Sequence, residues 1–128
     1  MPGVLKTVNP DGARAGHFLS GPFDPNRSSE EIVIAIAAPA MDAGTVLGKV
    51  TASGQYVPYN PAGADGSQNF AGILYDRVED STATQKAVAI VRHQVVNANL
   101  LTFVNALNAG QLATMIAAAA AQGVILRY

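Results

Sequence analysis

The sequence contains no cysteine and no tryptophan, and its 128 residues include only two histidines. Without cysteine the chain has neither a disulfide framework nor thiolate chemistry. His17 and His93 are far apart in the sequence and lie in no ligand motif, which argues against a zinc site. We therefore expect no metal and no cofactor, and stability must come from packing and assembly.

Charge is also scarce. Charged residues make up 13% of the chain, whereas hydrophobic residues make up 49%, and an ordinary soluble domain is about a quarter charged. A surface with so few charges tends to present apolar patches, which favours a homo-oligomer or a subunit docked on a partner. The alternative is an alanine-rich monomer, because alanine exposes little area per residue.

Several partner classes are disfavoured. The formal net charge is −1 and no cluster of lysine and arginine occurs, so the counterion release that drives nucleic-acid binding has no source. No apolar run approaches the ~20 residues that cross a bilayer, and the N-terminus lacks the features of a signal peptide. We expect no nucleic acid and no membrane as partner, and synthesis in the cytoplasm.

No enzyme motif is apparent. The acidic pairs Glu30-Glu31 and Glu79-Asp80 are unconvincing as carboxylate dyads, because neighbouring residues in a strand point to opposite faces. His93 ends a predicted strand without a catalytic motif around it. Lys49 has two interpretations. A lysine between strands can carry a swinging cofactor, but the position of Lys49 inside a predicted strand favours a solvated side chain. We expect no catalysis.

The first 29 residues predict an extended N-terminal arm. Prolines and glycines interrupt this segment throughout, which prevents a long helix and allows at most short edge strands. The arm either packs loosely on its own domain or orders on a partner by adding a strand to a sheet edge. It carries more apolar side chains than a solvating tail needs: Val4, Leu5, Val8, Phe18, Leu19 and Phe23.

Residues 30–128 predict one compact, mainly β domain. Short runs rich in β-branched residues are separated by turn formers, and the segment 60–69 consists of turn formers throughout. Closely spaced short strands favour a small β-barrel or a sandwich. We expect strands at residues 32–38, 44–51, 55–59, 70–75 and 85–92.

A single helix is expected near the C-terminus. Asn108 is a good N-cap and Gly123 is placed to end the helix, which is followed by a final strand at 124–128. The fold class is therefore mainly β with one C-terminal helix (α+β), preceded by the arm. One helical face carries the apolar spacing i, i+3, i+4, i+7: Leu112, Met115, Ile116 and Ala119.

Residues 97–107 are ambiguous. The segment is apolar without a clear period, and a short helical turn there would suit a subunit interface. The candidate interface side chains are Leu100, Leu101, Phe103 and Val104.

The order of motifs resembles the head decoration proteins of lambda-like phages. Residues 38–47 read Ala-Pro-Ala-Met-Asp-Ala-Gly-Thr-Val-Leu, and residues 70–74 read Phe-Ala-Gly-Ile-Leu. The helix at 114–123 followed by Val-Ile-Leu is similar to the close of those proteins. The similarity covers most of residues 30–128, and the arm matches in character.

The resemblance implies a function. It implies a homotrimer at the three-fold and quasi-three-fold positions on the outer surface of the expanded capsid, where it binds the major capsid protein and holds neighbouring subunits together against the pressure of packaged DNA. It implies no catalysis, and an N-terminal arm that is disordered when free and becomes an extended strand against the shell. The arm's apolar side chains would then contact the capsid, and the apolar residues of segment 97–107 would contact the other protomers.

Three alternatives stay open. A carrier or ligand-binding β-barrel would use a modified Lys49. A small enzyme would use His93 with a nearby carboxylate. A tail or neck component would remain structural but act elsewhere in the virion.

Overall fold

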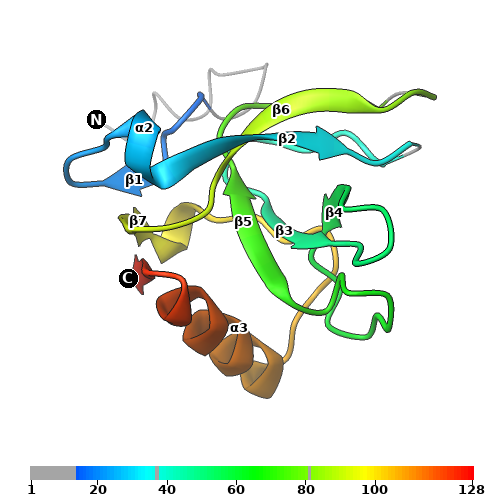
Figure 1. Ribbon diagram of the computed structural model, residues 1–128. Coiled ribbons are helices and arrows are strands. Elements are labelled where there is room, and N and C mark those ends of the chain that lie inside the picture. The colour runs from blue at the N-terminus through cyan, green and yellow to red at the C-terminus, as the bar shows by residue number, and fades with distance from the viewer. Residues whose placement is uncertain (1–13, 37, 81) are drawn as a thin grey trace, which may run out of the picture.

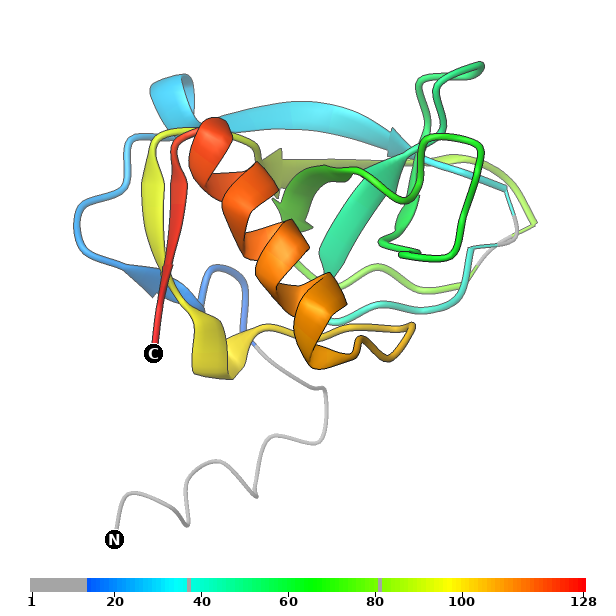
Figure 2. The same ribbon diagram turned by 90° about the horizontal axis from the view of Figure 1, so that it is seen from below.

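The computed structural model describes residues 14–128 except residues 37 and 81. Its centre is a closed β-barrel, flanked by a small sheet and one long helix (Figures 1 and 2). The mainly β fold with a C-terminal helix is thereby confirmed. Of the predicted arm, residues 1–13 lie outside the described residues.

The barrel contains the predicted hairpin and the two strands that follow it. β2 closes the barrel, because it pairs antiparallel with β6 on one side and parallel with β4 on the other. The strand order is β2-β4-β3-β5-β6. The strands are β2 (Ser29–Ile34), β3 (Val46–Lys49), β4 (Tyr56–Pro58), β5 (Phe70–Leu74) and β6 (Gln85–Ile90).

Two hydrophobic clusters lie on opposite sides of the barrel wall. On β2, Glu31 and Val33 are exposed while Ile32 and Ile34 are buried, so the latter point into the barrel. On β3 and β5 both faces are buried, which accounts for their continuous apolar runs. The cluster inside the barrel includes Ile32, Ile34, Met41, Leu47, Leu74 and Ala89.

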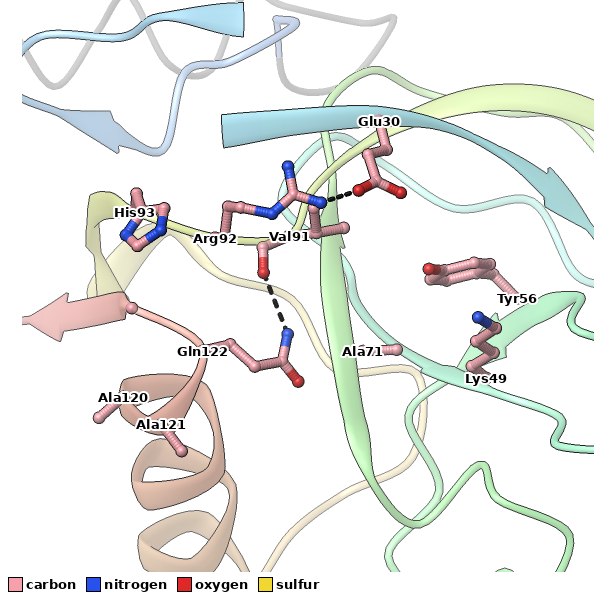
Figure 3. A pocket seen from close by; sticks show the side chains of 11 residues that line it. Glu30, Lys49, Tyr56, Ala71, Val91, Arg92, His93, Ala120, Ala121 and Gln122 are labelled. Atoms are coloured by element: carbon pink, nitrogen blue, oxygen red, sulfur yellow. Dashed lines mark hydrogen bonds and ion pairs between the residues drawn. The ribbon is translucent and has the colours of Figure 1, made fainter. Parts of the chain in front are cut away.

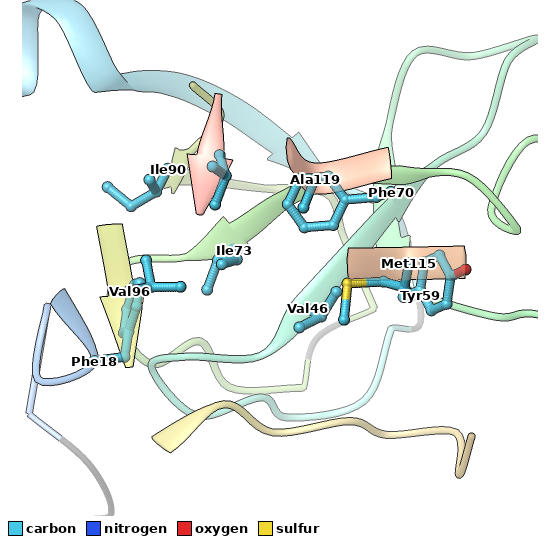
Figure 4. Packing of buried hydrophobic residues seen from close by; sticks show 10 residues of the cluster. Phe18, Val46, Tyr59, Phe70, Ile73, Ile90, Val96, Met115 and Ala119 are labelled. Carbon is cyan, nitrogen blue, oxygen red and sulfur yellow. The ribbon is translucent and has the colours of Figure 1, made fainter. Parts of the chain in front are cut away.

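The second cluster lies outside the wall, under a three-stranded sheet and the helix (Figure 4). The sheet has the order β1-β7-β8, with β8 parallel to β7. Its strands are β1 (Leu19–Ser20), β7 (Gln94–Asn97) and β8 (Val124–Arg127), and α3 (Ala109–Ala121) packs against β5 and β8. The buried members are Phe18, Val46, Tyr59, Phe70, Ile73, Ile90, Val96, Met115, Ala119 and Val124.

The helix caps agree with the sequence. The side chain of Asn108 accepts a hydrogen bond from the backbone N–H of Gln111, and the Gln111 side chain accepts one from the Asn108 N–H, which completes a capping box. The helix ends at Ala121 and the chain turns at Gly123, whose φ of 85° suits glycine. Met115 and Ala119 are fully buried, and Leu112 and Ile116 pack beside them, half-buried.

The loop at residues 60–69 is confirmed and is fastened to the barrel. The Asp65 carboxylate accepts hydrogen bonds from the hydroxyl of Ser67 at 2.5 Å and from its backbone N–H at 3.1 Å. These bonds lower the pKa of Asp65 below its ordinary value. The backbone at Ser67 lies directly against Gly48 of β3, where a β-carbon would collide with it. The absence of a side chain at Gly48 thus sets the position of the loop.

The structure differs from the prediction at several places. The first barrel strand was expected at residues 32–38 but runs from Ser29 to Ile34, because it starts at the end of a one-turn helix, α2 (Pro25–Ser28). Proline is tolerated at the first helical position, and the Asp24 side chain caps the turn by accepting from the Asn26 N–H at 3.0 Å. The strand β7 was not predicted at all.

The burial of Met115 yields a stability prediction. Met115→Asp places a carboxylate at a site with 0% exposure, and we expect a loss of more than about 4 kcal/mol in the free energy of unfolding. The measurement is urea unfolding followed by circular dichroism. Ala117→Asp is the control, because Ala117 is exposed on the same helix. Equal unfolding curves for both variants would contradict the helix packing described above.

Candidate functional site

The side chains predicted to form the arm fall into two groups. Val4, Leu5 and Val8 lie outside the described residues. The other three lie on the domain itself. Phe18 is fully buried, and Leu19 lies in β1, where it pairs with Val96 of β7.

The third of these residues, Phe23, stacks on Tyr75 with ring centroids 5.7 Å apart. The packing of this segment has a clear physical reason. The outer edge of β7 offers unpaired backbone groups, and β1 satisfies them, with the Asn97 N–H donating to the Phe18 carbonyl at 2.8 Å. Residues 14–29 therefore belong structurally to the domain, which differs from an arm that extends to residue 29.

The candidate interface residues occupy the connection between the small sheet and α3. Only residues 98–100 are helical, as the 3-10 turn η1 (Ala98–Leu100). The chain then runs beside β3, because Thr102 exchanges backbone hydrogen bonds of 2.9 Å with Gly44 and Val46. The side chains of Leu100, Leu101 and Phe103 pack partly buried against the outer cluster.

Val104 differs from these three neighbours. Its side chain is 45% exposed, whereas the other three pack against the outer cluster. The structure thus separates the four predicted residues into three that contribute to the core and one that is available at the surface.

A groove runs between the C-terminal end of α3 and the barrel (Figure 3). Its volume is about 670 Å³. Arg92 forms an ion pair with Glu30 at one side, and the Gln122 amide donates to the Val91 carbonyl at 3.0 Å at the other. The groove is open and its lining mixes polar and apolar residues, including Lys49 and His93.

Neither Lys49 nor His93 is placed for an obvious reaction. The Lys49 ammonium lies 5.7 Å from the centroid of the Tyr56 ring, a cation–π contact that holds it on the barrel surface. Burial raises the pKa of Tyr56 above its ordinary value. Within the described part of the chain, His93 has no hydrogen bond or ion pair to a carboxylate. The arrangement therefore offers no paired general acid and base.

Other sites can be assessed only where the structure describes the chain. Among residues 14–128 without 37 and 81, no group of three histidine, aspartate or glutamate side chains is placed to hold a metal ion. Over the same residues, no helix has the length and apolar character to cross a membrane.

The turn between β6 and β7 is held in place by α2. The hydroxyl of the buried Ser28 donates to the His93 carbonyl at 3.0 Å, and the Val91 N–H donates to the Ser28 carbonyl at 2.8 Å. His93 itself adopts a φ of 51°, a left-handed conformation that is uncommon outside glycine. The Arg92 guanidinium donates to the Arg27 carbonyl at 2.9 Å. Together these contacts fix two arginines and a histidine at one end of the molecule.

Comparison with known protein families decides the identity. The family model described as bacteriophage lambda head decoration protein D matches residues 10–124 of the chain. The chain belongs to this family. It is therefore a structural protein of the phage virion that decorates the head and binds the capsid. A search of curated proteins finds no match to this decoration protein.

The family match also bears on the alternatives. The resemblance read from residues 38–47 and 70–74 is confirmed, since both segments lie within the matched range. A role in the head, as opposed to the tail or neck, follows from the family description of this decoration protein. The match begins at residue 10 and so includes the segment that packs as β1 and α2.

The position of Phe18 gives a testable distinction between arm and core. Phe18→Ala empties a site with 0% exposure, and we expect it to lower the free energy of unfolding by about 3–5 kcal/mol. Phe23→Ala is the matched control. Because Phe23 is only partly buried against Tyr75, the expected loss is about 1–2 kcal/mol. Urea unfolding measures both, and a Phe18→Ala variant as stable as the wild type would show that this segment is dispensable to the fold.

Proposed function

We propose that the protein assembles as a homotrimer on the outer surface of the expanded phage capsid, at three-fold and quasi-three-fold positions. Its partner there is the major capsid protein, and its role is to hold neighbouring subunits together against the pressure of packaged DNA, without catalysis. The observation that carries the proposal is the match of residues 10–124 to the head decoration family. The protein is made in the host cytoplasm and joins the head from outside.

The physical mechanism is multivalent binding. A trimer that spans a junction engages several capsid subunits at once, so each contact can be weak while the whole dissociates slowly. A protein that binds the expanded lattice and not its precursor stabilises the expanded state by mass action. The low share of charged residues, 13%, suits a chain whose surface is covered by other subunits.

We assign the capsid contact of the arm to Val4, Leu5 and Val8. Phe18 and Leu19 are already engaged with the domain's own core and with β7, and Phe23 is stacked on Tyr75. We therefore assign the partner contact to the three remaining apolar side chains of the predicted arm. An extended segment of this kind binds by adding a strand to an exposed sheet edge, with alternate side chains in pockets.

We assign the contact between protomers to the connection before α3. Val104 is exposed, and its neighbours Leu100, Leu101 and Phe103 pack against the outer cluster. An exposed apolar side chain on a well-packed base is a good anchor for a subunit interface, since little side-chain entropy is lost on binding.

Deleting residues 1–13 tests the arm. The deletion keeps β1 and the buried Phe18, so we expect the truncated chain to fold, with binding to expanded heads lost or reduced by at least about tenfold. The measurement is cosedimentation with purified expanded heads that lack decoration protein. Precursor heads serve as the negative control for the full chain. A truncated protein that still saturates expanded heads would refute the arm assignment.

Val104→Asp tests the interface between protomers. A charge at this exposed position leaves the monomer fold intact but opposes burial against a second copy, so light scattering should report a monomer where the wild type is a trimer. Ala106→Asp is the control, because Ala106 is exposed on the same connection. A trimeric Val104→Asp variant would place the interface elsewhere, and a monomeric wild type would overturn the trimer itself.

A further inference from the structure

The small sheet β1-β7-β8 has one covered face and one open face. Val96 of β7 and Val124 of β8 are fully buried toward the outer cluster, so their neighbours along each strand point the opposite way. The register places Ser20, Val95 and Ile125 in one row across the three strands. Ile125 is 37% exposed, and this row forms a partly apolar floor.

Ser20 and Val95 of this row line a second groove, with a volume of about 480 Å³. Arg27 of α2, His93 of the β6–β7 turn and Arg127 of β8 line it, and none of the lining residues carries a carboxylate. Arg27 and Arg127 are exposed and form no ion pair within the described residues, whereas the nearby Arg92 is paired with Glu30. We call this surface the basic face. Its positive charge stands out because the chain as a whole has a net charge of −1.

Gln94 also lines the groove, but its side chain belongs to the covered face of the small sheet. It is 3% exposed, it is in register with Val124 and it lies two residues from Val96, so it points toward the outer cluster. Its amide nitrogen donates to the carbonyls of Val95 at 3.2 Å and, more weakly, of Ser20 at 3.5 Å. The groove therefore offers a ligand the charges of Arg27 and Arg127 rather than the amide of Gln94.

We propose that the basic face binds an acidic segment of the major capsid protein. Carboxylates of that segment pair with Arg27 and Arg127, which form no ion pair among the described residues, and its apolar side chains cover Val95 and Ile125. Arginine pairs with carboxylates through two parallel hydrogen bonds, which gives such a contact geometry as well as attraction. The inference rests on the proposed binding to the capsid and adds a second contact to that of the arm.

The placement of the basic face favours the capsid over a second copy of the chain. β1 is the first strand after the N-terminal segment, and β1, α2 and the C-terminus gather at one end of the molecule in both views (Figures 1 and 2). An arm that holds the capsid therefore brings the basic face toward the same partner. Two linked contacts with one partner reinforce each other through the effective concentration of the second.

The double variant Arg27→Glu/Arg127→Glu tests the proposal. Both side chains are exposed, so the fold and the mass of the assembly should be unchanged. Affinity for expanded heads should fall roughly tenfold at low salt, with a weaker dependence on salt than in the wild type. Lys49→Glu/Lys86→Glu is the matched control, because it makes the same change in net charge at exposed sites outside the basic face.

The outcomes separate this inference from the proposed function. A double variant that binds heads as well as the wild type, while deletion of residues 1–13 abolishes binding, would overturn the basic face and leave the function standing. A double variant that changes from trimer to monomer, with the control unaffected, would assign the face to contacts between copies and overturn the capsid partner. A wild type that does not bind expanded heads would overturn the proposed function itself.

Discussion

The fold depends on the need to cover both sides of one wall of the barrel. Val46 and Ile73 face outward from β3 and β5, yet both are fully buried, while their neighbours Leu47 and Leu74 fill the barrel interior. A five-stranded barrel cannot bury its outer surface by itself, so the chain supplies a second layer from α3 and the small sheet. Residues 14–29 contribute to this second layer by adding a third strand to the small sheet. The same packing sets the position of the basic face.

The sequence identified elements whose signals are local. The hairpin around β3 and β4 has strand runs joined by a glycine-containing turn, and α3 has its N-cap and apolar spacing within a few residues of each other. It did not identify β1, a strand of two residues whose existence depends on the distant edge of β7. The basic face was hidden for the same reason, since Arg27 and Arg127 lie near opposite ends of the chain and meet only because β1 and β8 flank β7.

The candidate residues fall into side chains that pack in the core and side chains that are exposed at the surface. Phe18 and Leu101 pack in or against the outer cluster, whereas Val104 and Arg127 are exposed. In the proposed binding mode, specificity for the capsid resides in several weak contacts that must fit at the same time.

The central place of β7 in the small sheet has a consequence for biogenesis. β1 pairs with one edge of β7 and β8 with the other, so the segments nearest the two ends of the chain must both find the same short strand. Such distant pairings slow folding, because the chain loses conformational entropy in closing a long loop before the stabilising contacts between the strands form. β8 follows α3 in the chain, so during synthesis the small sheet stays incomplete until β8 has emerged. A nascent chain that lacks β8 leaves part of the outer cluster uncovered and is consequently exposed to aggregation.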